Sequence, residues 1–557
     1  MTTPAITTRA QLIDALRLAA ELEHGLMCQY LFAAYSLKRY PYECWDGPEK
    51  TQELMTQAEL ERVRRWAMKI ALIARQEMEH LGLALNMLSA IGGTPSFSRP
   101  NMPQREHYYG EACIKLELTR CNLATIERFQ AFEAPDHLSV PCELVDQQAA
   151  IDHCRQPGVP PDEVFAAFLQ DKDSGLLQGA PHIDQYGVPY KNVQELYQSV
   201  ADGFTHVSTE LGESNLFIGN PGNQVFGGPA SPLYGQMNDL NQYGLSLIAV
   251  TDLTSALTAI RMIIEQGEGA SVPPNYLPNT HFCLFTSIRT EMQADASRLA
   301  EIGTRPVAPN PMVRLQPDVP VPDEVTLIRN ANTRAVAELF NESYEVMLLL
   351  LLYLYSDQNQ STDQTNSLMD AAFFPFMTMF IRPLAEILTQ LPVDEDPNVT
   401  AGPGFELAGD VILLPNLPET WTMFQERLDT LQANFRKVTA RRPLPPPEGH
   451  PLRGRDPVKP VWGWVPLHDP WLALPWQEFP EVVAERTQAW EKIKQEGTTI
   501  WPDEETLAAN AAVGEPFTAN VNVPPSLPWL RLYYLRQNME RMAVNWANNW
   551  TNVGRTS

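Results

Sequence analysis

The chain has 557 residues, 44% of them hydrophobic, which is enough to bury a sizeable core and to form more than one domain. Lys and Arg number 41 against 67 Asp and Glu, and the formal net charge of −26 argues against nucleic acid or an anionic membrane as a general partner. The longest apolar run, residues 346–355, is too short to span a bilayer, and the first residues show no signal-peptide pattern. Seven cysteines without a Cys-x-x-Cys pair are expected to be reduced thiols, so the expected location is the cytoplasm.

Apolar periodicity predicts a mainly helical chain. The first predicted helix begins at a capping-box pattern, Thr8 with Gln11, and the second ends at the pair Gly92-Gly93, a natural stop. The predicted helices cover about residues 8–38, 56–90 and 122–133, start again near residue 192, and then cover about residues 245–266, 332–356, 367–391 and 418–438.

A long Pro-rich segment, about residues 94–190, separates the second main helix from the third and has one strand candidate at residues 113–118. Ferritin-like four-helix bundles can have such a crossover connection. Residues 443–480 contain eleven prolines, and nine of the twelve tryptophans lie in residues 441–557. The expected fold is mainly α: a ferritin-like four-helix bundle with extra helices over residues 1–440, then an irregular Pro/Trp-rich extension, residues 441–557, that packs its aromatic side chains on the bundle.

Three polar side chains lie on helix faces that are otherwise apolar. Glu23 lies on an apolar stripe of the first helix, and Glu77 with His80 lies on an apolar stripe of the second. Because a buried, unpaired carboxylate is costly, something must compensate for it, and a metal ion does so. The Glu77-x-x-His80 spacing places two ligands one turn apart, as in di-iron and di-manganese bundles. The alternative is a snorkelling glutamate beside a chance Glu-x-x-His.

Two neighbours of Glu23 bear on this site. Tyr30, seven residues further along the same helix, is expected to stand near the metals and is the candidate catalytic side chain; the alternative is a core tyrosine. His24 points about a quarter-turn away from Glu23, so we expect it to support the site or the fold and not to bind metal.

The third and fourth helices offer further candidate ligands. Glu195 lies at the border of an apolar stripe, where a solvated helix charge is an equally simple interpretation. Glu265 and Glu268 are three residues apart near the end of the fourth helix, and His281 begins the segment after a Pro-containing loop. Periodicity favours Glu268 over Glu265 as the inward residue, but which of the two binds metal stays open.

Several segments resemble the ferritin-like domain of the iminophenyl-pyruvate dimer synthase family. The main ones are LAAELEHG at residues 18–25, RQEMEHLGLALNML at residues 75–88 and AIGGTP at residues 90–95. Shorter matches follow in order at residues 195–197, 250–253, 265–269, 279–282, 382–386 and 400–406. The resemblance implies the ligands Glu23, Glu77, His80, Glu195, Glu265 and His281. The family's namesake enzyme is much longer than this chain, so its reaction is not carried over.

Carboxylate and imidazole ligands suit iron, manganese or zinc. The first hypothesis is an oxygen-dependent di-iron oxidase or oxygenase that acts on a small aromatic or amino-acid-derived molecule in secondary metabolism. Its cofactors are two iron ions, or manganese or another divalent metal, and its partners are dioxygen, the small molecule and an unidentified electron donor. A homo-oligomer is compatible with the sequence.

Two other functions are compatible with the pattern. A ferroxidase or iron-storage protein suits the net charge of −26, but the long crossover and the C-terminal extension are unlike a short storage subunit. A ferritin-like scaffold with an empty or structural metal site would act as a binding or interaction protein instead.

Overall fold

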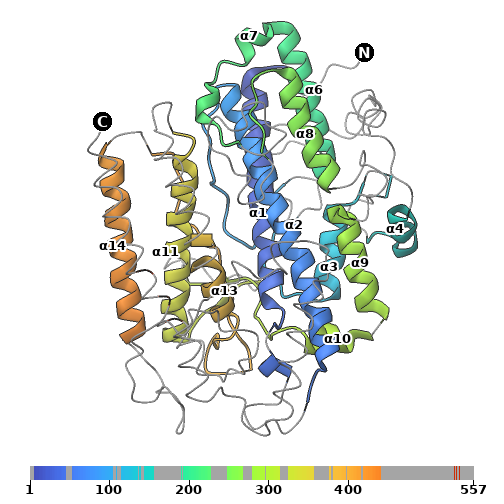
Figure 1. Ribbon diagram of the computed structural model, residues 1–557, viewed down its shortest axis with the longest axis vertical. Coiled ribbons are helices and arrows are strands. Elements are labelled where there is room, and N and C mark those ends of the chain that lie inside the picture. The colour runs from blue at the N-terminus through green and yellow to red at the C-terminus, as the bar shows by residue number, and fades with distance from the viewer. Residues whose placement is uncertain are drawn as a thin grey trace, which may run out of the picture.

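The computed structural model shows a mainly helical protein (Figure 1). The residues that the structure describes are 6–39, 41–44, 53–104, 108–109, 115–135, 137–138, 144–155, 190, 192–226, 247–267, 279–294, 296–313, 324–356, 376–377, 380–396, 398–414, 418–440, 532, 535 and 539. The α-helices are α1 (Arg9–Ser36), α2 (Gln57–Ala90), α3 (Leu123–Phe132), α4 (Gln147–Cys154), α6 (Val193–Leu211), α7 (Glu213–Leu216), α8 (Leu253–Gly267), α9 (His281–Ala294), α10 (Ala296–Ile302), α11 (Ala331–Tyr353), α13 (Arg382–Leu388) and α14 (Pro418–Ala440). Two short strands, β1 (Pro311–Met312) and β2 (Thr326–Leu327), pair in parallel.

Helices α1 and α2 form the centre of the bundle, and each begins at a capping box, with Thr8 and Thr56 as the N-cap residues. Helix α2 ends where Gly92 takes a φ of 82° and the Gly93 N–H donates to Leu88 O at 2.9 Å. Glycine suits this turn because it has no Cβ to clash in the left-handed region. The predicted start of the first helix and the predicted end of the second are therefore confirmed.

In place of the third and fourth long helices of a four-helix bundle, this protein has two pairs of shorter helices. Helices α6 and α8 contact each other beside one half of the α1–α2 pair, and α3 and α9 contact each other beside the other half (Figure 1). The third helix of the bundle is thus interrupted between α3 and α6, and the fourth between α8 and α9. The N-caps Asn122 and Asn192 start α3 and α6 as the sequence predicts.

A second group of helices covers the opposite side of α1. Helix α11 contacts α13 and α14, and α13 contacts α1 (Figure 1). These helices confirm the predictions at residues 332–356 and 418–438. In the predicted 367–391, residues 376, 377, 380 and 381 are π-helical and lead into α13, whereas residues 367–375, 378 and 379 lie outside the described part. Leu532, Leu535 and Met539 are buried in the same core as α1 and α2. The tryptophans after residue 440 lie outside the described residues, so their packing stays a prediction.

Helix α8 begins at Leu253, later than the predicted residue 245, because residues 247–250 are not helical and are held by hydrogen bonds to another segment. The Val250 N–H donates to Gln224 Oε1 at 2.7 Å, and Gln224 Nε2 donates to Val250 O at 2.8 Å. Asp252 Oδ1 then accepts the Ser255 N–H at 2.8 Å, in the manner of an N-cap. The prediction was wrong here because a short apolar run can be buried as a helix or as an extended segment.

The strand predicted at residues 113–118 is absent from its described part, residues 115–118. The Glu117 N–H donates to Gln29 Oε1 at 3.0 Å, and the Leu118 N–H donates to Asn310 Oδ1 at 2.7 Å. The carbonyls of Leu116 and Leu118 accept from the backbone N–H groups of Gln104 and Asn310, so side-chain amides and isolated backbone bonds satisfy this segment in place of a strand ladder.

Two cysteines correct the expectation of reduced thiols. Cys154 on α4 and Cys283 on α9 form a disulfide with their Cα atoms 5.6 Å apart. They are separated by 129 residues in sequence, so only the tertiary fold brings them together. Cys28, Cys44 and Cys121 are free and buried. In the described part of the chain no helix combines the length and apolarity that crossing a membrane requires.

Candidate metal centre

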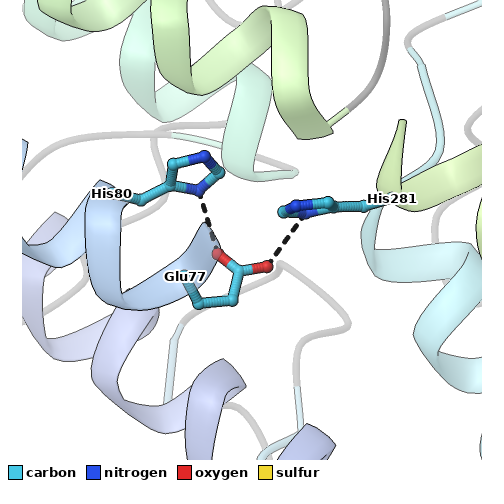
Figure 2. A group of neighbouring side chains, drawn as sticks. All are labelled: Glu77, His80 and His281. Carbon is cyan, nitrogen blue, oxygen red and sulfur yellow. Dashed lines mark hydrogen bonds and ion pairs between the residues drawn. The ribbon is translucent and has the colours of Figure 1, made fainter. Parts of the chain in front are cut away.

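Three buried side chains from two helices meet inside the bundle. Glu77 and His80 are one turn apart on α2, and His281 is the first residue of α9. Figure 2 shows the Glu77 carboxylate between the two imidazoles: Oε2 is 3.0 Å from His80 Nδ1, and Oε1 is 3.0 Å from His281 Nδ1. One ligand atom of each residue lies within 4.8 Å of the others. Glu77 therefore presents one oxygen to each histidine.

Two further carboxylates stand beside the histidines. Glu23 Oε2, from α1, is 3.6 Å from His80 Nδ1, and Glu133 Oε2, from the C-cap residue of α3, is 3.5 Å from His281 Nδ1. The five residues form two halves that share Glu77. We call Glu23 with His80 the first half, and Glu133 with His281 the second half.

Each outer carboxylate accepts a hydrogen bond from a buried tyrosine. Tyr197 OH, on α6, donates to Glu23 Oε1 at 2.7 Å, and Tyr30 OH, on α1, donates to Glu133 Oε1 at 2.5 Å. Burial and the neighbouring carboxylates raise the pKa of both phenols well above the usual range, so both stay protonated and act as donors. In both glutamates Oε1 accepts the hydrogen bond from the tyrosine, whereas Oε2 faces the histidine.

Each histidine is bound through its other ring nitrogen to a glutamine. His80 Nε2 lies 3.0 Å from Gln266 Oε1, and His281 Nε2 lies 3.2 Å from Gln76 Oε1. Because an amide oxygen is an acceptor, each Nε2 carries the proton that it donates. Both Nδ1 atoms then face Glu77.

The buried charges shift one another's pKa values. Burial and the Glu77 carboxylate raise the pKa of Glu23 to about 7. Burial disfavours a charged His281, but Glu77 and Glu133 outweigh it and raise the pKa of His281 to about 9. The pKa of His80 is also raised well above its usual range, against burial, by Glu77 and Glu23. When no cation is bound, protons on the two histidines and on Glu23 therefore offset the charge of the three carboxylates.

The donor atoms fit a divalent transition metal. Glu77 Oε1 and His281 Nδ1 are buried and 3.0 Å apart without the alignment of a hydrogen bond, so their contact is an ion pair that a cation can replace when it displaces the proton of His281. A cavity of about 20 Å³, lined in part by Glu23, His80 and Glu133, adjoins them, which is room for about one water-sized species. Carboxylate oxygen and imidazole nitrogen are ligands for iron, manganese and zinc.

Four of the residues proposed from the sequence come together here: Glu23, Glu77, His80 and His281. Tyr30 lies beside them through its bond to Glu133. His24 does not join them: its Nδ1 lies 2.9 Å from Phe97 O, and its Nε2 contacts the Tyr344 hydroxyl.

The other proposed ligands are placed differently. Glu195 is buried in the first turn of α6 but is not among the residues that line the cavity. Glu265 is partly exposed, and its Oε1 lies 2.8 Å from Arg261 Nε, one turn earlier on α8. Glu268 lies outside the described residues. Metal binding by these three residues stays a prediction. The ion pair with Arg261 argues against it for Glu265.

The sequence interpretation missed Glu133, Tyr197 and the two glutamines. A signal for Glu133 was present, because Ile126, Phe129 and Glu133 are spaced as one face of the predicted crossover helix. This is the same criterion that selected Glu23. Tyr197 lies on an apolar stripe with nothing in the sequence to separate it from a core residue.

Comparisons with known proteins agree with this architecture. The chain matches a ferritin-like family model over residues 16–290, a range that includes both halves of the site. It is 26% identical over 450 residues to dichlorochromopyrrolate synthase of Lentzea aerocolonigenes, covering 74% of this chain and 37% of that protein. It is 24% identical over 393 residues to 2-imino-3-(indol-3-yl)propanoate dimerase of Chromobacterium violaceum, covering 70% of this chain and 33% of that protein.

These matches confirm the family resemblance seen in the sequence motifs. The chain spans about a third of the length of either curated relative. A crystal structure of a ferritin-like protein from Caulobacter vibrioides also matches, with 17% identity over 66% of this chain and 94% of that one, but its TM-score of 0.37 is too low to carry an argument.

Proposed function

We propose that this chain, which matches a ferritin-like family model over residues 16–290, is an enzyme whose two-half centre holds two metal ions, iron in the first instance. Glu23 and His80 would hold one ion, Glu133 and His281 the other, and Glu77 would bridge them. The observation that carries this proposal is the position of Glu77, whose two oxygens are each 3.0 Å from a different histidine. A carboxylate shared in this way is how di-metal bundles place two ions side by side.

Bound iron would supply the reduction of dioxygen and the oxidation of an organic substrate. The residues of the chain would hold and isolate that chemistry. Tyr197 and Tyr30 each fix one carboxylate by a hydrogen bond to Oε1, so the other oxygen stays directed at the metal position. Leu26, Val193 and Ile263 form an apolar part of the cavity wall, which limits the entry of water.

The proposed substrate class is a small aromatic, amino-acid-derived molecule. The support is the name of one relative, 2-imino-3-(indol-3-yl)propanoate dimerase, which describes an imino acid that carries an indole ring. Because the match covers 33% of that protein, we propose the class of molecule and not the dimerisation itself.

Metal content tests the proposal directly. We expect protein produced in iron-replete medium to contain about two irons per chain by plasma mass spectrometry. The anaerobic ferrous form should change its absorption when oxygen is added. A chain without stoichiometric metal, even after reconstitution, would be a scaffold. Oxygen consumption that depends on added ferrous iron and on no organic substrate would instead indicate a ferroxidase.

Two matched variants test the choice of ligands. Glu133→Gln removes a carboxylate beside His281, whereas Glu265→Gln removes one that lies 2.8 Å from Arg261. We expect Glu133→Gln to lose about one metal per chain and Glu265→Gln to keep both. The reverse result would restore Glu265 as the ligand and contradict the proposed second half.

A further inference from the structure

Gln76 and Gln266 occupy equivalent places in the two halves of the site. Gln266 Oε1 lies 3.0 Å from His80 Nε2, and Gln76 Oε1 lies 3.2 Å from His281 Nε2. Gln76 is buried on α2, next to Glu77 in sequence, and Gln266 is the penultimate residue of α8. Neither glutamine was selected from the sequence.

The hydrogen bond to a glutamine determines which ring nitrogen can bind metal. A neutral imidazole has one N–H and one nitrogen with a free lone pair. When Nε2 donates its proton to an amide oxygen, the lone pair belongs to Nδ1. In both histidines Nδ1 is the nitrogen within 3.0 Å of a Glu77 oxygen. The two bonds therefore select the tautomer that directs a lone pair to each metal position.

Both bonds also cross between helices. Gln266 connects the end of α8 to His80 on α2, and Gln76 connects α2 to His281 at the start of α9. The fourth helix of the bundle is interrupted between α8 and α9, so these two bonds fix the ring planes at the interruption. An amide serves here without adding a fourth negative charge to the three carboxylates already buried in the site.

We propose that Gln76 and Gln266 are positioning residues that set the Nδ1-donor tautomer of His281 and His80 and orient both rings for metal binding. This inference rests on the proposed di-metal function and deepens it. Residues that bind a metal-ligating histidine through its second nitrogen typically change metal affinity by about 10- to 100-fold when replaced. Gln76→Leu and Gln266→Leu should each weaken metal binding by that factor, while Gln76→Glu and Gln266→Glu, which keep an acceptor and add a negative charge, should bind at least as tightly as the wild type.

The experiment measures zinc binding to metal-depleted protein, with zinc as a diamagnetic probe. Calorimetry gives the affinity of each variant. Long-range ¹H–¹⁵N NMR of the zinc-loaded wild type gives the nitrogen that keeps its proton, which we expect to be Nε2 in both histidines. Gln224→Leu is the matched control. Gln224 is also buried, and its bond to Val250 lies before the start of α8, at the opposite end of that helix from Gln266. The zinc affinity of this variant should therefore stay within about twofold of the wild type.

The possible outcomes separate this inference from the function on which it rests. Wild-type protein that takes up neither zinc nor iron contradicts the di-metal function, and this inference with it. Wild-type protein that binds two equivalents, together with Leu variants that bind as tightly, contradicts the positioning role alone. Nδ1 protonation in the zinc-loaded wild type also overturns it. Weaker binding in both Leu variants, recovery in the Glu variants and a protonated Nε2 support it.

Discussion

Glu77 Oε1 and His281 Nδ1 lie 3.0 Å apart although the two residues are about 200 positions apart in sequence, on α2 and α9. Both atoms are buried, and neither is aligned for a hydrogen bond with a described group. While His281 is protonated, the two atoms form an ion pair that offsets part of the cost of burying them. A cation between the two atoms takes over that role and also neutralises the crowded carboxylates.

The bridging position of Glu77 predicts an unequal effect of ligand substitutions. Glu77→Gln should remove both metals, with affinity lowered by more than about 100-fold, whereas Glu23→Gln should leave the second half able to bind about one ion. Mass spectrometry of the purified proteins measures the difference, and circular dichroism checks that the helices persist. Full metal retention in Glu77→Gln contradicts the bridge.

Metal binding should depend on pH with a defined sign. In the metal-free protein the pKa of His281 is about 9 and that of Glu23 about 7, so both carry protons near neutrality that a metal must displace. Affinity should therefore rise from pH 6 to about pH 9, with proton release that calorimetry detects as a dependence of the heat on the buffer. An affinity that is flat over this range contradicts the assignment of these residues as ligands.

The same pKa shifts predict that the stability of the metal-free protein falls as pH rises, whereas its metal affinity rises. His281 has a folded pKa of about 9 against about 6.5 in an unfolded chain, so its contribution is complete below pH about 6.5 and is lost as pH rises to 9. The raised pKa of Glu23 acts in the same direction between about pH 4.5 and 7. The free energy of unfolding, measured with urea, should fall from pH 6 to pH 9. His281→Gln should reduce this slope.

Gly219 should not accept a side chain. A Cβ at this position would lie 1.9 Å from Ser89 O, a backbone atom at the end of α2, whereas one at Gly409 would meet nothing within 4 Å. Gly219→Ala should lower the free energy of unfolding by about 1–3 kcal/mol or more, because the loop must move away from α2. Gly409→Ala, the control, should change it by less than about 1 kcal/mol. Equal stabilities for the two variants contradict this packing.

The Cys154–Cys283 disulfide should contribute to stability by closing a loop. For a loop of this size, with a sequence separation of 129, the chain-entropy estimate is about 4–5 kcal/mol. Reductant should therefore lower the unfolding temperature of the wild type, and Cys154→Ser should lower it to a similar value that reductant no longer changes. An identical unfolding temperature with and without reductant shows that the bond does not form in the protein.

The sequence located the part of the site that lies on uninterrupted helices. Glu23, Glu77 and His80 stand on long helices, where a carboxylate on an apolar stripe is visible from spacing alone. Glu133 follows the same rule, but it caps a helix of only ten residues within the crossover, where so short an apolar stripe is a weaker signal.

Other residues of the site could be assigned only from the tertiary structure. Glu265 is four residues after Arg261, a spacing that equally suits an ion pair on a helix surface, and the structure has that pair. The stripe of α8 alone could not separate the two possibilities. No local pattern marks Gln76 or Gln266, because their function depends on histidines that only the fold brings near.

The interruptions of the bundle give the two halves of the site different mechanical supports. Glu23 and His80 stand within the uninterrupted helices α1 and α2, whereas Glu133 and His281 stand at the ends of α3 and α9, which pack together. The disulfide ties α9 in turn to α4. A small displacement of the α3–α9 pair along α1 and α2 would thus change the spacing between the two metal positions while each kept its own histidine and outer carboxylate. The spacing of the two halves therefore depends on how the α3–α9 pair docks beside α1 and α2, and Glu77 is the residue that contacts both halves.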